Sequence, residues 1–264
     1  ISNRSYVDIY QYPVFPILFF YNKSKNYTQV GRNLGEHIGF QTEINEGSIR
    51  KQLTIETFQN IIDQNDEPEN EGETPCYFST HYSNTIYTCN YMLRIFPYSF
   101  AAIELQGNYF DSPDRLFYSI PETFYNIATH KSDLRELIPE FFYFPEIFLN
   151  YNKINFHERA NKVLVDNIIL DSDIINSNER PDDSIYKYSL FIKQMKTKLE
   201  NSNISNWIEI IFGSKQKYYG KKKEDLLFRK ESYIDYSNES NQLFNEYIKD
   251  KLIMTSVDFG LIPL

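Results

Sequence analysis

Residues 136–146 read ELIPEFFYFPE, an aromatic run that Pro139 and Pro145 interrupt. Its apolar side chains follow neither the period of an amphipathic helix nor the alternation of a half-buried strand. Proline removes a backbone hydrogen-bond donor and disfavours helix interiors and central strands. Residues 12–21, YPVFPILFFY, have the same character. We therefore expect both segments to form irregular, buried backbone.

Buried irregular backbone needs a hydrogen-bond partner for each N–H and C=O group. The sequence is rich in Asn, Gln, Tyr and Ser, whose side chains donate and accept such bonds. We therefore predict a core held by bonds between side chains and backbone. The residues expected to build the core are Tyr12, Pro13, Phe15, Phe141, Phe142 and Trp207, and those expected to brace it are Asp111, Arg115, Glu140 and Glu146.

Helical spacing dominates the rest of the chain, and strand alternation is scarce. We expect helices from Ser83 to just before Pro97, from Ser112-Pro113 through Phe124, from Asp182-Asp183 through Leu199, from Ile204 to a stop at Gly213, and over residues 244–251. No repeat and no secure domain boundary is visible. The prediction is a mostly α single domain over residues 1–264, with helices around irregular extended core segments.

Composition excludes several function classes. The 264 residues include 27 Lys or Arg and 36 Asp or Glu, so the formal net charge is −9, and we expect no nucleic-acid partner. Two cysteines, Cys76 and Cys89, are too few for a disulfide framework or a four-cysteine zinc site. The four histidines form no i, i+4 pair, and we expect no metal site. The longest apolar run is too short to cross a bilayer.

The best candidate for a nucleophile and base is Thr80-His81-Tyr82-Ser83. A histidine between such neighbours is more often a hydrogen-bonded packing element, and no third group that would orient it is evident. Packing is therefore the favoured interpretation. The alternative is a hydrolase or transferase that uses His81 with Asp111 or Glu140.

Charged residues at two other places in the sequence are expected to stabilise the fold through ion pairs. Asp111 and Arg115 are four residues apart at an expected helix start, which favours an ion pair. Glu140 and Glu146 flank the aromatic run, and buried carboxylates need partners such as Arg94 or Arg115.

The basic cluster contains Lys215, Lys217 and Lys221–Lys223, interleaved with two tyrosines. A solvated loop is the favoured interpretation, because the net charge of the chain repels an anionic surface. A weak contact of Lys215–Lys223 with anionic lipid is the alternative.

Taken in order, six segments resemble the BEACH domain family, named after the beige and Chediak–Higashi proteins and including neurobeachin-like proteins. They are residues 4–16, 80–83, 105–117, 136–146, 207–216 and 259–263. The chain departs from the family at Ile17, where a tryptophan is usual, and it lacks the Pro-Pro-Trp stretch expected around residues 170–174.

This resemblance implies a mostly helical fold around irregular core segments, with no catalytic activity and no cofactor. It implies a non-enzymatic scaffold of a large cytoplasmic protein, peripherally associated with membranes, that acts in vesicle trafficking, lysosome size control or autophagy. The expected partners are an adjacent PH-like domain and proteins at membrane surfaces. Because the chain begins with Ile, we expect a fragment, with the family's first helix, the PH-like domain and the WD40 repeats outside it. The motif positions expected to bind are Tyr12, His81, Asp111, Arg115, Glu140, Glu146 and Lys215.

Overall fold

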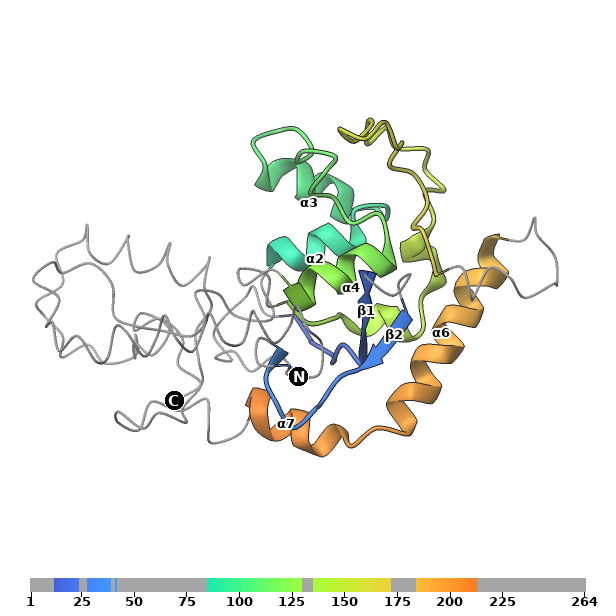
Figure 1. Ribbon diagram of the computed structural model, residues 1–264. Helices are drawn as coiled ribbons and strands as arrows, with labels where there is room; N and C mark the ends of the chain where they lie inside the picture. The colour runs from blue at the N-terminus through green and yellow to red at the C-terminus, as the bar shows by residue number, and fades with distance from the viewer. Residues whose placement is uncertain are drawn as a thin grey trace, which may run out of the picture.

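The computed structural model describes residues 12–23, 28–38, 41, 85–129, 135–171 and 184–212 (Figure 1). Two strands are present in these residues, β1 (Phe19–Asn22) and β2 (Thr28–Gly31). The α-helices described are α2 (Thr85–Met92), α3 (Tyr98–Leu105), α4 (Ile120–Thr129), α6 (Ser184–Glu200) and α7 (Ile204–Phe212), and the short 3-10 helices are η3 (Pro139–Phe142) and η4 (Pro145–Phe148). The described part of the chain is therefore partly helical with few strands.

The strands β1 and β2 form an antiparallel hairpin in which Phe19 pairs with Gly31 and Asn22 with Thr28. All four residues of β1 are buried, and α4 packs against this strand. The prediction of irregular backbone for residues 12–21 is therefore wrong at its end. A strand that is covered on both faces shows a continuous apolar run instead of alternation, so its period gives no signal.

The remaining part of the first segment is irregular and buried or half-buried, as predicted. Phe15 exchanges two backbone hydrogen bonds with Leu137, at N···O distances of 2.8 and 2.9 Å, which joins the two aromatic segments. Beyond this bridge, Pro139 and Pro145 each begin a single 3-10 turn. Residues 136–146 thus form neither a regular α-helix nor a strand.

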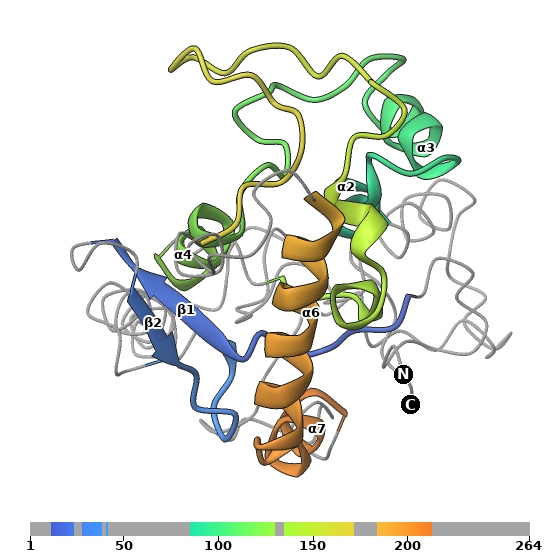
Figure 2. The same ribbon diagram turned by 90° about the vertical axis from the view of Figure 1, so that its right-hand side faces the viewer.

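The core is built around the Phe141 ring. Its centroid lies 4.8 Å from that of Tyr91, 5.7 Å from that of Phe117 and 5.5 Å from that of Phe148. Helix α6 packs on η3 and η4, and it passes beside the hairpin with α7 at its C-terminal end (Figure 2). Of the predicted core residues, Phe141, Phe142 and Trp207 are buried, whereas Tyr12, Pro13 and Phe15 are half-buried.

The helix predictions have mixed outcomes. The spans of α6 and α7 confirm their predictions, and α2 ends at Met92, a few residues before Pro97. The helix expected from Ser112 begins instead at Ile120. The Oγ atom of Ser119 accepts a hydrogen bond from the Glu122 N–H at 3.3 Å, so Ser119 caps this helix. Pro121 then lies in the first turn, where its missing N–H needs no partner.

The predicted bonds between side chains and irregular backbone are present. Asn150 Nδ2 donates to the Ile154 carbonyl at 2.9 Å, and Asn150 Oδ1 accepts from the Ile154 N–H at 3.0 Å. Asn152 donates to the Arg94 carbonyl at 3.1 Å. Gln41 Nε2 lies 3.1–3.2 Å from three carbonyl oxygens in residues 33–37. Amide side chains therefore replace the bonds that regular secondary structure would supply.

Candidate functional site

Two of the predicted positions, Tyr12 and Glu140, meet at the start of η3. The Tyr12 hydroxyl donates to Glu140 Oε1 at 2.7 Å, and the Tyr143 hydroxyl donates to the same oxygen at 3.0 Å. Burial, followed by the hydrogen bond to Glu140, raises the pKa of both phenols above the usual range. Glu140 itself is buried. Its partners are therefore two tyrosines and not the arginines expected from the sequence.

A second predicted pair, Asp111 and Arg115, also meets. An Arg115 Nη2 atom contacts Asp111 Oδ1, and the Ser112 N–H donates to the same oxygen at 2.7 Å. The pair spans a turn that the bond from Arg115 N–H to the Ser112 carbonyl closes, whereas a helix start was expected. Arg115 is largely exposed, so the contact braces a surface turn.

This pair lies between two pockets. Asp111 lines a pocket of about 40 Å³ beside α3, and Arg115 lines a more open pocket of about 260 Å³ that also includes Tyr118 and Glu122. Asn90 and Leu116 line both of them. Of the two carboxylates that the hydrolase alternative offers as partners of His81, Asp111 lines a pocket and Glu140 lines neither of these two.

The other predicted positions are separate from these pairs. Glu146 is half-buried, and no hydrogen bond of its carboxylate is found within the described residues. Arg94, which the sequence offered as a partner for these glutamates, is fully buried and donates to the carbonyls of Phe117 at 2.9 Å and Asp166 at 2.8 Å. Burial lowers the pKa of Arg94 to about 9. His81 and Lys215 lie outside the described residues.

The structure also contains a buried polar cluster that sequence reasoning missed. Arg32 Nη1 and Nη2 donate to Glu136 Oε2 at 2.6 Å and Oε1 at 2.8 Å, and both side chains are fully buried. Glu136 Oε2 also accepts from the Ile17 N–H at 3.0 Å, and Oε1 accepts from Trp207 Nε1 at 3.0 Å. The sequence feature that could have indicated this cluster is the position of Glu136, the first residue of the aromatic run 136–146.

This Glu136 cluster, comprising Ile17, Arg32, Glu136 and Trp207, joins the two ends of the β1–β2 hairpin to two segments that lie far from it in the sequence. Tyr91 adds α2 to them, because its hydroxyl donates to the Glu136 carbonyl at 3.2 Å. Arg32 Nη1 also donates to the Ile17 carbonyl at 3.1 Å, whereas its buried Nε has no hydrogen-bond partner in the described part of the chain. A bidentate pair whose carboxylate accepts further hydrogen bonds offsets much of the cost of burying the two charges. Its chemical role is therefore to fix the relative positions of segments.

A third set of charges lies at the surface near α4. The Arg159 guanidinium lies over the Tyr118 ring at 3.7 Å from its centroid, and Arg159 Nη2 is 3.2 Å from Glu122. Asp114 completes the set, 3.5 Å from Arg159 Nε and accepting from the Ala160 N–H at 3.2 Å. These carboxylates thus hold the segment around residue 160 against α4.

No group of three or more His, Cys, Asp or Glu residues suited to a metal ion occurs among the described residues. None of the helices they form is long and apolar enough to span a membrane.

Comparison with known proteins gives a consistent result. The sequence model of the Beige/BEACH domain matches residues 1–264. The chain is 31% identical over 226 residues to Beige protein homolog 1 of Schizosaccharomyces pombe, which covers 82% of this chain and 8% of that protein.

Two other relatives have a similar sequence identity to this chain. The Lysosomal-trafficking regulator of Drosophila melanogaster is 34% identical over 226 residues, 82% of this chain and 6% of that protein. The human WD repeat- and FYVE domain-containing protein 4 is 29% identical over 271 residues, 99% of this chain and 8% of that protein. The chain therefore spans less than a tenth of the length of these relatives.

Proposed function

Because this chain belongs to the BEACH domain family, we propose that it is a non-enzymatic scaffold module of a large protein that acts in membrane trafficking. The name of the fruit-fly relative, a lysosomal-trafficking regulator, supports a role in trafficking. The finer assignment is to vesicle trafficking, lysosome or lysosome-related organelle size control, or autophagy. The module is one domain over residues 1–264 of a cytoplasmic protein that associates peripherally with membranes.

The observation that carries this proposal is how the buried carboxylates are used. Glu136 accepts hydrogen bonds from Arg32, Trp207 and the Ile17 N–H, and Glu140 accepts from two tyrosines. A general acid or base must exchange a proton with a substrate within hydrogen-bond reach. Glu136, whose two oxygens are both engaged, instead fixes the relative positions of the segments that form the surface on which a partner docks.

The proposed partners are an adjacent PH-like domain and proteins at membrane surfaces. Support comes from the family and from the human relative, whose name records WD repeats and a FYVE domain in the same protein. Membership of multidomain proteins favours a module that works through neighbouring domains. The positions proposed to take part are Tyr12, His81, Asp111, Arg115, Glu140, Glu146 and Lys215.

The competing function, a hydrolase or transferase based on His81, is tested with the complete protein. His81→Gln, which keeps a hydrogen-bonding side chain for a partner but cannot act as an acid or base near neutral pH, is introduced in cells of the source organism, and lysosome size is compared with that of cells lacking the protein. A scaffold predicts that this variant, present at normal abundance, retains normal lysosome size. An enzyme predicts that it behaves as the absence of the protein does.

The PH-like partnership is tested by cross-linking mass spectrometry on the complete protein. Cross-links between the PH-like domain and residues 1–264 that survive dilution support association within one chain. Their absence, with both domains folded, contradicts the proposed partner.

The lipid alternative at Lys215–Lys223 needs its own assay. Charge reversal of these lysines is compared with the unchanged protein in flotation with vesicles of phosphatidylcholine and phosphatidylserine. Flotation that is indifferent to both charge reversal and salt excludes this contact.

A further inference from the structure

Helix α3 has a burial pattern opposite to that of an ordinary surface helix. It packs against α2, and Ser99 is its buried residue, with Oγ donating to the Leu93 carbonyl at 2.7 Å. Phe100 on the same helix is 62% exposed and Leu105 is 48% exposed. An amphipathic helix normally turns its large apolar side chains towards the core. In α3 a serine faces inward and a phenylalanine faces solvent.

Exposed aromatic side chains also flank the helix at both ends. Phe96, which is 48% exposed, stacks on Phe100 with ring centroids 5.0 Å apart and an interplanar angle of 14°. Tyr109, beyond the C-terminal end, is 68% exposed. We call the segment that carries Phe96, Phe100, Leu105 and Tyr109 the α3 surface. Large apolar side chains exposed in one short segment are typical of an interaction site.

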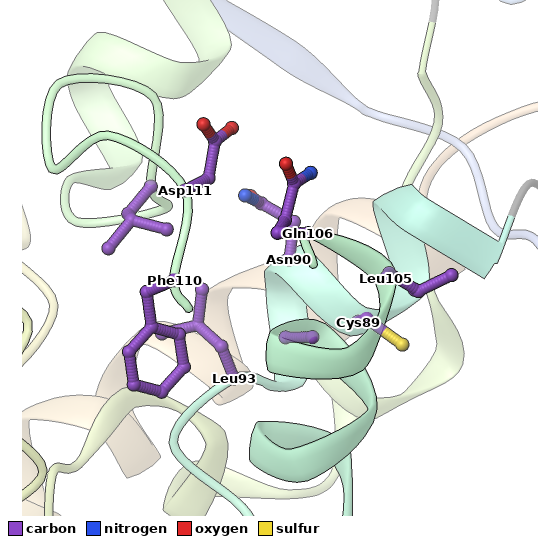
Figure 3. A pocket seen from close by; sticks show the side chains of 9 residues that line it. Cys89, Asn90, Leu93, Leu105, Gln106, Phe110 and Asp111 are labelled. Atoms are coloured by element: carbon purple, nitrogen blue, oxygen red, sulfur yellow. The ribbon is translucent and has the colours of Figure 1, made fainter. Parts of the chain in front are cut away.

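A pocket opens beside this surface, with Leu105 on its rim (Figure 3). Its volume of about 40 Å³ has room for the end of one aliphatic side chain, and Leu93, Ala102 and Phe110 contribute to its lining. The amides of Asn90 and Gln106 and the Asp111 carboxylate lie together on another side of the pocket in Figure 3. An apolar anchor with polar groups beside it would be accommodated there.

The charges around the α3 surface decide which partner suits it. The charged side chain of α3 is Glu104, whereas Asp111 pairs with Arg115 and Asp114 with Arg159. Glu104 is exposed and four residues from Phe100, so the two side chains share a face of the helix. An anionic lipid surface, or a second copy of this chain with its net charge of −9, would bring further negative charge towards Glu104. A basic group on the partner is complementary to Glu104.

We propose that the α3 surface docks an amphipathic segment of a protein partner, which places a Leu or Phe anchor at the pocket and Lys or Arg beside Glu104. This inference rests on the proposed scaffold function and deepens it, since it gives the chemistry of one partner and the surface that receives it. The i, i+3 and i+4 spacing of a helix is the arrangement that sets apolar anchors and basic groups side by side.

The test is a selection of peptides on the complete protein. A phage-displayed library of helix-forming peptides, with positions varied among Leu, Phe, Ser, Lys, Arg and Glu, is selected in parallel on the unchanged protein and on the double variant Phe100→Ser, Leu105→Ser. We expect peptides that join Leu or Phe with Lys or Arg to be enriched about tenfold or more on the unchanged protein, the usual effect of removing an interface anchor. Glu104→Lys is expected to shift the selected peptides towards Glu.

The matched control is Tyr151→Ser, which removes an equally exposed aromatic side chain elsewhere. It should select the same peptides as the unchanged protein, and all variants are compared by thermal unfolding. Equal enrichment on the unchanged protein and the double variant overturns the proposal, and so does selection of acidic peptides. If the unchanged protein floats with phosphatidylserine vesicles and the double variant does not, the surface binds lipid and the proposal is overturned. If the unchanged protein self-associates in sedimentation and the double variant does not, the surface binds a second copy instead.

Cross-linking to the PH-like domain, measured on the same samples, separates this proposal from the proposed function. If no such peptides are selected but the cross-links to the PH-like domain are present, only the proposal for the α3 surface is overturned. If the peptides are selected but the cross-links are absent, only the proposed PH-like partnership is overturned.

Discussion

The indole nitrogen of Trp207 donates to Glu136 Oε1 at 3.0 Å, on a carboxylate that Arg32 already holds in a bidentate pair. This bond ties α7, the last helix of the described residues, to the centre of the molecule. Because Trp207 is the single tryptophan of the chain, its fluorescence reports directly on this contact.

Glu136→Gln should destabilise the chain strongly. The substitution keeps the shape but leaves the buried Arg32 charge uncompensated, for which a loss of about 3–5 kcal/mol is typical. A urea titration followed by Trp207 emission measures the free energy of unfolding. Asp111→Asn is the matched control, since it removes the same charge from the exposed pair with Arg115 and should change stability by about 1 kcal/mol or less. Equal effects of the two variants would contradict the assigned role of the Glu136 cluster.

Trp207→Phe should weaken the docking of α7. A smaller aromatic ring replaces the buried indole and Glu136 loses one hydrogen bond, and the lost bond alone is expected to lower the free energy of unfolding by about 1–3 kcal/mol. Hydrogen exchange of the α7 amides is the measurement, and these should exchange faster than those of α4. Uniform loss of protection in both helices would show that the bond does not act locally.

Ser119→Ala should destabilise α4 by about 1 kcal/mol, because Ser119 Oγ caps the helix. Ser112→Ala is the control, because the helix begins at Ile120 and not at Ser112. It should leave the urea midpoint unchanged. A larger loss of stability in Ser112→Ala than in Ser119→Ala would instead support a helix that begins at Ser112.

Stability should fall at alkaline pH in part through Tyr188. Burial raises the pKa of Tyr188 to about 12, and its hydroxyl donates to the Ile168 carbonyl at 2.8 Å. Because the folded pKa exceeds the unfolded value near 10, this contribution is complete below pH 10 and is lost as pH rises towards 12. Arg94 has the opposite effect on stability, because burial lowers its folded pKa to about 9 and the folded state then binds fewer protons than the unfolded state above that pH.

Comparison with Tyr188→Phe isolates the contribution of the Tyr188 hydroxyl. The difference in unfolding free energy between the unchanged chain and this variant should be constant below pH 10. Above pH 10 the unchanged chain should lose stability relative to the variant, by about 1.4 kcal/mol for each pH unit by which the folded pKa exceeds the unfolded pKa. A difference independent of pH up to 12 would contradict the shift.

Sequence reasoning was effective where local chemistry determines the structure. The periodic helices α6 and α7 were predicted, and so were the irregular aromatic run, its burial and the amide bonds of residues such as Asn150. The pairs Tyr12–Glu140 and Asp111–Arg115 meet in the structure, although Glu140 was expected to need an arginine.

The misses have a common physical cause. The apolar side chains of helix α3 are spread around its axis, so they show no helical period, and strand β1 is buried on both faces. The Arg32–Glu136 pair joins residues 104 positions apart, and no local pattern records such a partnership. Ile17 is fully buried and supplies a backbone N–H to the cluster.

The Glu136 cluster also bears on how the chain is made. Its bonds connect Glu136 backwards over 119 and 104 residues and forwards over 71 residues, so a ribosome must release Trp207 before the carboxylate has its full set of donors. Contacts of such long range slow folding. Until α7 emerges, the nascent domain holds a half-satisfied charge in its interior, and a chain cut short before α7 would be a natural substrate for chaperones and proteases.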